Sequence, residues 1–151
     1  MHSFRRARRS DLTAIIGLLA DDDLGQNREI ASDPPDARYL AAFDAIEADP
    51  NQLLGVAVNG DDNPVGCLQL TFIPGLSRTG MWRGQIESVR IAQSERGSGL
   101  GTRFIEWAVA RCEERGCGLV QLTSDKTRDD AIRFYEKLGF VASHEGLKRN
   151  L

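Results

Sequence analysis

Three glycines within five residues constrain this chain more than any other feature of its sequence. The segment Arg96-Gly97-Ser98-Gly99-Leu100-Gly101-Thr102 lies between a predicted strand and a predicted long helix. Glycine adopts positive φ at no steric cost and lets a ligand approach the backbone, but glycines at a helix start weaken the helix unless something uses them. The first amides of a helix lack an intrahelical acceptor, and the helix dipole adds about half a positive charge there. The segment therefore predicts a phosphate-binding turn, with a glycine-rich connection that holds no ligand as the alternative.

Two common phosphate-binding patterns do not match this segment. A Walker loop requires Gly-Lys and then Ser or Thr after four spacer residues, and the chain lacks that order. A dinucleotide fingerprint requires G-x-G-x-x-G after the first strand of a βαβ unit, whereas this segment has G-x-G-x-G and follows an antiparallel hairpin. Arg96 and Arg103 add positive charge at the same end of the helix. A nucleotide- or dinucleotide-binding module is kept only as an alternative.

Length and charge set the scale of the fold. With 151 residues, 41% of them hydrophobic and 27% charged, we expect one globular domain over residues 1–151. No apolar run approaches the ~20 residues of a membrane helix, and the basic start of the chain leads into no signal-peptide core. We therefore expect a cytoplasmic protein without a membrane partner. The net charge of −3 gives no general nucleic-acid footprint.

The three cysteines and two histidines follow no metal-binding spacing. Cys67, Cys112 and Cys117 each lie in an apolar stretch, so we expect buried, reduced thiols. His2 and His144 are far apart in the sequence. No metal site is predicted.

Hydrophobic periodicity predicts an α+β (mixed α/β) fold in which the turn residues 59–64 close a hairpin. Apolar residues at helical spacing predict helices at 12–19, after Pro34-Pro35, at 99–115 and at 128–138. Alternating or continuous apolar runs predict short strands at 4–7, 53–58, 65–73, 85–91, 118–123, 140–143 and 147–150.

Two motifs about 30 residues apart resemble the GNAT N-acetyltransferase superfamily. Arg96-x-x-Gly99-x-Gly101 matches the family's [QR]-x-x-G-x-[GA] pyrophosphate loop. The segment 129–140, DDAIRFYEKLGF, looks like its A-x-x-[FL]-Y-x-x-x-G-F motif, and 85–91 resembles its central strand. The resemblance covers nearly the whole chain. It implies a central, mostly antiparallel twisted sheet of six to seven strands flanked by four helices.

The resemblance also implies acetyl-CoA as cosubstrate, with direct transfer of the acetyl group to a primary amine and no acyl-enzyme. The amides of 97–102 would hold the pyrophosphate, and the backbone around Val89 and Ile91 would pair with the pantetheine arm. Arg128 stands where members often carry Asn, and it could reach a phosphate or simply be an exposed arginine. The cosubstrate contacts implied in this way are Val89, Arg90, Ile91, Arg96, Gly97, Ser98, Gly99, Leu100, Gly101, Thr102, Arg128 and Phe134.

Two residues are the candidates for proton transfer. Tyr135 matches the motif's tyrosine, so the resemblance implies a general acid for the departing thiolate, with a core aromatic as the alternative. Glu87 is the candidate base or substrate orienter, with a solvated strand glutamate as the alternative. Strand alternation predicts that Glu87 shares a face with Gln85, Val89 and Ile91.

The acceptor is not specified by the sequence. The acidic segment 21–36 could attract a cationic amine, and Met81 and Trp82 in the 74–84 loop could line its pocket or a dimer contact. Both a small molecule and a peptide amine fit, and a homodimer is a possible assembly. A non-catalytic acyl-CoA-binding sensor of the same fold is the alternative function.

Overall fold

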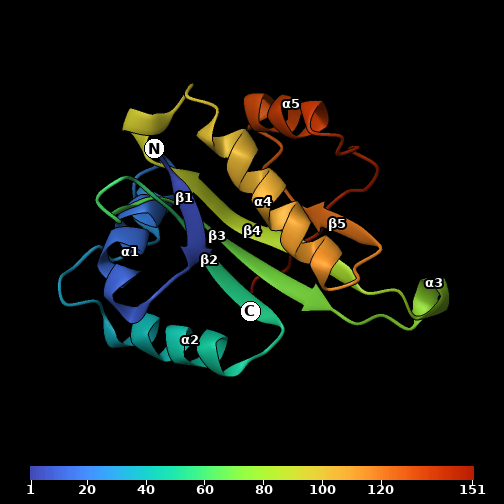
Figure 1. Ribbon diagram of the computed structural model, residues 1–151, viewed down its shortest axis with the longest axis horizontal. Helices are drawn as coiled ribbons and strands as arrows, with labels where there is room; N and C mark the ends of the chain where they lie inside the picture. The colour runs from blue at the N-terminus through green and yellow to red at the C-terminus, as the bar shows by residue number, and fades with distance from the viewer.

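The turn-rich segment 59–64 joins two neighbouring antiparallel strands of the sheet. The computed structural model describes residues 1–151 and contains a single five-stranded sheet in the order β1-β2-β3-β4-β5 (Figure 1). The first four strands pair antiparallel, and β5 alone pairs parallel to its neighbour β4. The strands are β1 (Ser3–Arg6), β2 (Gln52–Val58), β3 (Pro64–Ile73), β4 (Arg83–Ile91) and β5 (Leu119–Leu122).

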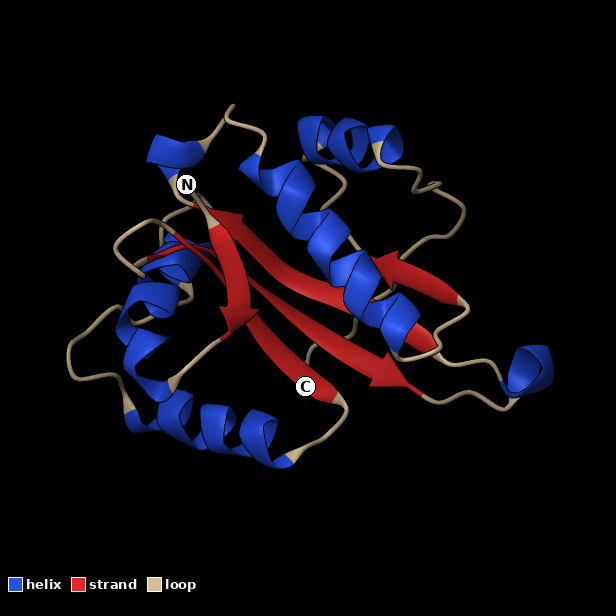
Figure 2. Cartoon of the chain, viewed as in Figure 1, coloured by secondary structure: helices blue, strands red, loops and turns tan.

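Helices cover both faces of the sheet (Figure 2). One face packs on α4, whose apolar side includes Leu100, Phe104 and Ala108, to form the main core. The other face packs on α1 and α2 through Ile15 and Phe43. The helices are α1 (Leu12–Ala20), α2 (Ala37–Ala48), α3 (Ser77–Gly80), α4 (Leu100–Glu114) and α5 (Asp129–Lys137). This arrangement confirms the α+β class, with one short extra helix, α3. No helix combines the length and apolar content that crossing a bilayer demands.

Glycines in the sheet allow α4 to lie close to the strands. A Cβ on Gly55 would meet the Trp107 ring, and one on Gly84 would overlap the Cys112 sulfur. At the far end of α4, Gly116 adopts φ 78° and closes the helix, as its position in the sequence predicts. The helix axis is thereby fixed over β4.

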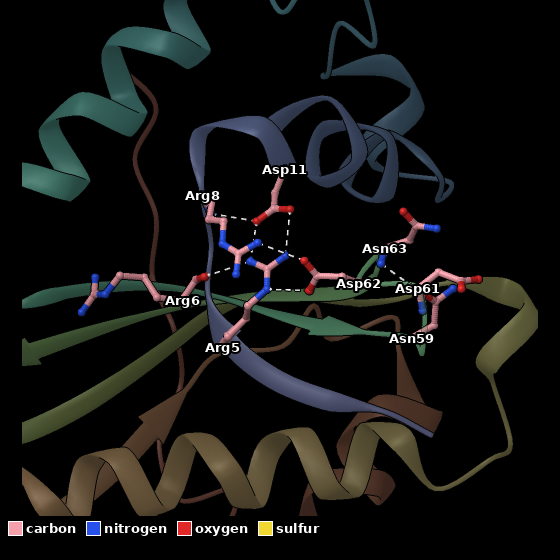
Figure 3. Close-up of polar contacts among 8 residues, drawn as sticks. All are labelled: Arg5, Arg6, Arg8, Asp11, Asn59, Asp61, Asp62 and Asn63. Atoms are coloured by element: carbon pink, nitrogen blue, oxygen red, sulfur yellow. Dashed lines mark hydrogen bonds and ion pairs between the residues drawn. The ribbon is translucent and has the colours of Figure 1, made fainter.

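A polar network fixes the start of the chain to the β2–β3 turn (Figure 3). Arg5 of β1 donates from Nη1 and Nη2 to both carboxylate oxygens of Asp11, at 2.7 and 3.1 Å, and from Nε to Asp62 at 3.0 Å. The Arg8 amide also donates to Asp11, at 2.7 Å. Burial alone would raise the pKa of Asp11, but these donors together hold it below its usual value. The network therefore requires an ionised Asp11.

The prediction of six or seven strands is wrong for the end of the chain. Residues 140–143 and 147–150 form no strand, and the sheet has five. Beyond Gly139, the only amides that donate a backbone hydrogen bond are those of Phe140, to the Tyr135 carbonyl, and Ser143, to the Val141 carbonyl. This segment pairs with no strand although the outer edge of β5 is unpaired, so its apolar pattern alone does not make it a strand.

Candidate active site

The glycine-rich turn presents a row of free amides at the start of α4. Gly97 and Gly99 adopt φ values of 80° and 83°, in the left-handed region that glycine reaches without strain. The N–H groups of Gly97, Gly99, Gly101 and Thr102 donate no hydrogen bond within the chain. A Cβ added at Gly97 or Gly99 would meet nothing within 4 Å, so the backbone there faces open space. Free amides and a helix N-terminus together make an anion-binding surface.

Side chains on either side of the turn hold its shape. Ser98 donates from Oγ to the Glu95 carbonyl at 2.5 Å. The Glu95 carboxylate pairs with His2 Nε2 at 2.9 Å, and Arg103 Nη2 lies 3.4 Å from the other ring nitrogen of His2. His2 therefore connects the start of the turn to the first turn of α4. Sequence reasoning missed this role, because nothing in the sequence places residue 2 beside residue 95.

The glycine-rich turn and the 129–140 motif are in contact in the structure. A Cβ at Gly101 would lie 3.5 Å from Cζ of Phe134 and 3.8 Å from Cγ1 of Ile91, which are ordinary van der Waals distances. Phe134 of α5 therefore packs over the first turn of α4 and the end of β4. A glycine or an alanine fits at position 101, whereas a larger side chain would displace the Phe134 ring.

Strands β4 and β5 separate beside the turn. Their pairing ends at Ile86 and Leu122, while β4 continues to Ile91. Along residues 87–91 the β5-side edge of β4 has no strand partner. The Val89 carbonyl accepts from Arg90 Nη1 at 2.9 Å, and the other backbone groups on this edge can pair with an extended ligand.

A bulge in β4 changes which side chains share a face. Ser88 has φ 55°, and between the pairs Cys67–Arg90 and Gln69–Glu87 the strand β4 holds one residue more than β3. Ile86, Val89 and Ile91 all pack against the core under α4, whereas Glu87 is exposed on the opposite face. The expectation that Glu87 shares a face with Val89 and Ile91 is therefore wrong, because the bulge inserts a residue between them.

A cavity of about 140 Å³ lies where the two strands separate. Its lining draws on both sides of the sheet, since Ile86 belongs to the core under α4 and Glu87 to the opposite face. Tyr135 of α5 also lines it, so the two candidates for proton transfer border one space. The segment 123–125 forms a further wall that sequence reasoning did not identify. This segment directly follows β5, which has a parallel neighbour, and ligands bind beyond the carboxyl ends of such strands. Its position in the sequence could therefore have identified it as part of the site.

Tyr135 is held by aromatic contacts. Its ring makes edge-to-face contacts with Phe134 and Phe140, with centroid distances of 5.1 and 5.8 Å. Burial raises the pKa of the Tyr135 phenol above 10.0, although the nearby cations Arg128 and Arg90 lower it in part. The phenol is thus a neutral O–H donor across the physiological range.

Charged side chains surround the cavity. Arg90 points to the α1 side of the sheet, where its Nε lies 2.8 Å from Oδ2 of Asp22, and both atoms are buried. The approach is not aligned with the N–H bond, so this is an ion pair without a hydrogen bond. Burial raises the pKa of Asp22, but the Gly25 amide and Arg90 outweigh it and leave the pKa below its usual value. Arg128, at the start of α5, lines the cavity and forms no ion pair.

The residues expected on the acceptor side are placed as follows. Neither Met81, whose side chain packs close to Gly118, nor Trp82 lines the cavity. In the acidic segment 21–36, Asp22 pairs with Arg90 and Asp36 with Arg38, whereas Asp21, Asp23 and Asp33 are exposed and form no ion pair. No group of three or more His, Cys, Asp or Glu side chains could hold a metal ion.

Comparison with known proteins defines the class. Residues 16–140 match the model of the acetyltransferase (GNAT) family. An aminoalkylphosphonate N-acetyltransferase of Salmonella typhimurium is 32% identical over 106 residues, which cover 70% of this chain and 68% of that protein. A glucosamine 6-phosphate N-acetyltransferase of Trypanosoma brucei brucei is 29% identical over 90% of this chain and 95% of that protein. The chain belongs to the GNAT acetyltransferase family.

A solved structure extends the likeness to the whole chain. A transcriptional regulator from Bacillus halodurans C-125 is 48% identical, with a TM-score of 0.97 over 100% of both chains. The family and the curated relatives support an acetyl-CoA-dependent acetyltransferase.

Proposed function

We propose that this protein transfers the acetyl group of acetyl-CoA directly to the primary amine of a small molecule, in a ternary complex. One observation carries the proposal: the cavity at the β4–β5 separation has Glu87 on one side of the sheet and Tyr135 on the other. A cosubstrate from the α4–α5 side and an amine from the opposite side could therefore meet within it. Neither needs to leave for the other to bind.

The cosubstrate would extend from the start of α4 into the cavity. Its diphosphate would accept hydrogen bonds from the free amides of Gly97, Gly99, Gly101 and Thr102, and Arg96 would add charge. The two amides of pantetheine would pair with the free edge of β4 around Val89 and Ile91, as an added strand does. Phe134 would form the α5 side of this cosubstrate-binding site, and Arg128 would lie close to the thioester end of the cosubstrate.

Proton transfers would be divided between the two candidates. Glu87 would accept a proton from the ammonium, directly or through one water molecule, to leave a nucleophilic amine. The amine nitrogen forms a bond to the acetyl carbon, the carbon–sulfur bond breaks, and the thiolate leaves. Tyr135 would donate its phenolic proton to that sulfur, and the second proton of the amine would restore the phenol. The products are an N-acetyl amide and CoA.

The cysteine chemistry supports direct transfer. An acyl-enzyme would need a reactive nucleophile at the cavity, and none of the three cysteines lines it. Cys67 lies nearest along the sheet, but burial raises the pKa of its thiol to about 12, so it stays protonated. The one Ser–His contact, Ser143 to His144, also lies outside the cavity.

The acceptors of the two curated relatives guide the choice of amine. Both proteins are named for small amines that carry a phosphonate or phosphate group. Arg128 lines the cavity without an ion-pair partner and could receive such an anion. We therefore place aminoalkylphosphonates and phosphorylated amino sugars first among the acceptors to test, ahead of polyamines and peptides.

The experiment is a thiol-release assay with acetyl-CoA over a panel of amines, with the product confirmed by mass spectrometry. We expect turnover of at least one small primary amine, and Glu87→Gln should lower kcat/KM more at pH 7 than at pH 9, where more of the amine is already neutral. The matched control is Glu113→Gln, at an exposed site on α4 outside the cavity.

A second candidate function has one observation in its favour. The Bacillus halodurans protein is described as a transcriptional regulator, so a non-catalytic acyl-CoA sensor is the alternative. Tight acetyl-CoA binding without thiol release from any amine would favour the sensor and exclude the transferase.

A further inference from the structure

The face of the sheet opposite α4 is divided into two halves. Near α1 it is apolar, and Val56 and Cys67 pack there against Ile15. In the other half, side chains that alternate with those packed under α4 are polar, uncharged and at least partly exposed. In Figure 1, α4 is drawn in front of β4, so these side chains lie on the far side of the sheet. They are here called the polar face and comprise Gln52, Gln69, Thr71, Gln85 and Gln121.

Strand register aligns four members of the polar face in one row. Gln52 lies opposite Thr71, and Thr71 lies opposite Gln85. Gln85 in turn lies opposite Gln121. The row therefore crosses the sheet from β2 to β5, over about 14 Å at the strand spacing of ~4.8 Å. A ligand of the size of a sugar ring can contact neighbouring side chains of the row at once.

The fifth member connects the polar face to the candidate active site. Gln69 of β3 lies opposite Glu87 of β4. Glu87 is exposed on this same side of the sheet and lines the cavity. The rest of a molecule whose amine reaches Glu87 from this side would therefore lie on the polar face.

The glutamines retain unused hydrogen-bonding groups of both kinds. Gln121 Nε2 donates to Gln85 Oε1 at 2.7 Å, which leaves the Gln121 oxygen and the Gln85 nitrogen without a side-chain partner. Gln52 Oε1 accepts from Gln69 Nε2 at 2.9 Å and from Thr71 Oγ1 at 3.1 Å. This leaves the Gln52 nitrogen and the Gln69 oxygen. Amide nitrogens and amide oxygens are thus available to a ligand in equal number.

Hydroxyl groups match this set of donors and acceptors. Each hydroxyl both donates and accepts, so a molecule with several hydroxyls can satisfy the free nitrogens and the free oxygens together. An ammonium group only donates, and an ionised phosphonate only accepts. The polar face therefore suits a polyhydroxylated molecule better than a polyamine or a simple aminoalkylphosphonate.

We propose that the polar face binds the hydroxyl groups of the acceptor and that the acceptor is an amino sugar. The inference rests on the proposed acetyl transfer and narrows its acceptor, because a simple aminoalkylphosphonate has no hydroxyl group to place here. With the amine at Glu87, the hydroxyls on the adjoining ring carbons hydrogen-bond to Gln69 and Gln85. The sugar ring then extends across the face toward Gln121.

The first test is calorimetric titration of the CoA-saturated chain with glucosamine 6-phosphate, which measures binding without turnover. We expect one site per chain, with a Kd at least about 10-fold lower than that of 2-aminoethylphosphonate or of a peptide that begins with alanine. Equal or tighter binding of either comparison amine, or no binding of glucosamine 6-phosphate, would overturn the proposal. Tight binding of the sugar without thiol release from acetyl-CoA would support the polar face and refute the proposed transfer, so the two failures are distinguishable.

The second test removes the amides one at a time. Gln85→Leu and Gln121→Leu keep the approximate side-chain size, and each should raise the Kd of glucosamine 6-phosphate by about 5-fold, the equivalent of one net hydrogen bond, and that of 2-aminoethylphosphonate by less. Gln121 is exposed on an edge strand, so its variant should fold even if the Gln85 variant does not. Glu113→Leu is the matched control, because it places the same side chain at an exposed position of α4 and should change neither Kd. An unchanged Kd of the sugar in Gln121→Leu and in any folded Gln85→Leu would refute the polar face as its binding surface.

Discussion

Tyr135 illustrates how one residue can serve both the core and the chemistry. Its ring packs between Phe134 and Phe140, which is what a core aromatic on a helix does. Tyr135 also lines the cavity, which a core residue does not need. The contacts fix the ring and leave the O–H available, so the two interpretations from the sequence are compatible.

Removal of that hydroxyl should separate the two roles. We expect Tyr135→Phe to lower kcat by roughly 10- to 1000-fold with little change in the Kd of acetyl-CoA, because the ring contacts remain and only the acid is lost. Since burial raises the pKa of Tyr135 above 10.0, the wild type should not lose activity through this group as pH rises to 9. Steady-state kinetics with calorimetric binding checks both. An unchanged kcat in the phenylalanine variant would remove Tyr135 from the reaction.

Asp11 is the residue on which the N-terminal network depends (Figure 3). Its side chain is almost fully buried and its pKa is lowered, so its stabilising effect is complete above the unfolded value of 3.8 and is lost as pH falls through the lower folded value. We expect Asp11→Ala to reduce the free energy of unfolding by about 3 kcal/mol at pH 7, because it leaves Arg5 short of its buried partner. Asp62→Asn, at the exposed end of the same network and at a positive φ that asparagine tolerates, should cost much less, because water screens an exposed ion pair.

Urea denaturation at pH 7 and at pH 3 measures these values. The difference between wild type and Asp11→Ala should shrink at the lower pH, where the unfolded carboxyl group is largely protonated. If the two aspartate variants lost equal free energy of unfolding, the buried Arg5–Asp11 pair would stabilise the fold no more than the exposed pair does.

At the scale of elements, the turn before α4 combines a left-handed backbone conformation at Gly99 with a surface suited to an anion. Gly99→Asp should weaken acetyl-CoA binding by at least 10-fold, because it places a carboxylate beside the diphosphate and adds strain at φ 83°. Gly99→Asn is the matched control, since asparagine has nearly the same size and tolerates this conformation. Calorimetric Kd values for both variants separate charge from strain. Binding as tight in Gly99→Asp as in the wild type would refute the assignment of the turn.

The contact between α4 and β4 depends on a glycine. A Cβ at Gly84 would overlap the buried Cys112 sulfur, so Gly84→Ala should destabilise the fold by about 1–3 kcal/mol. Gly60→Ala, where a Cβ meets nothing, should have little effect. In the double variant Gly84→Ala/Cys112→Ala the loss should be smaller than the sum of the single losses, because the clash is gone. Additive losses, measured by chemical denaturation, would mean that the two residues do not compete for space.

The elements differ in how far the sequence predicts them. The turn and the Phe134–Tyr135 helix follow from local patterns, because glycine conformation and helical spacing are local properties. The Ser88 bulge does not, since it depends on how β4 pairs with β3, and it reverses the face on which Glu87 lies. The strands predicted at 140–143 and 147–150 do not form for the same kind of reason: a local pattern does not specify whether a segment is placed against the free edge of β5.

At the scale of the whole molecule, the separation of β4 and β5 determines where the candidate site lies. It frees the end of β4 beside the amides of 97–102, opens a cavity between the two faces of the sheet, and brings Glu87 and Tyr135 to one space. We propose that acetyl-CoA binds along these features, from its diphosphate at the turn to its thioester in the cavity.

Calorimetric titration of the full chain with acetyl-CoA, with CoA, NAD and ATP as comparisons, tests this most directly. We predict that acetyl-CoA and CoA bind with one site per chain, and that NAD and ATP bind much more weakly, since neither supplies a pantetheine arm for the edge of β4. Binding of NAD or ATP in preference to acetyl-CoA, or no binding of acetyl-CoA, would contradict the account.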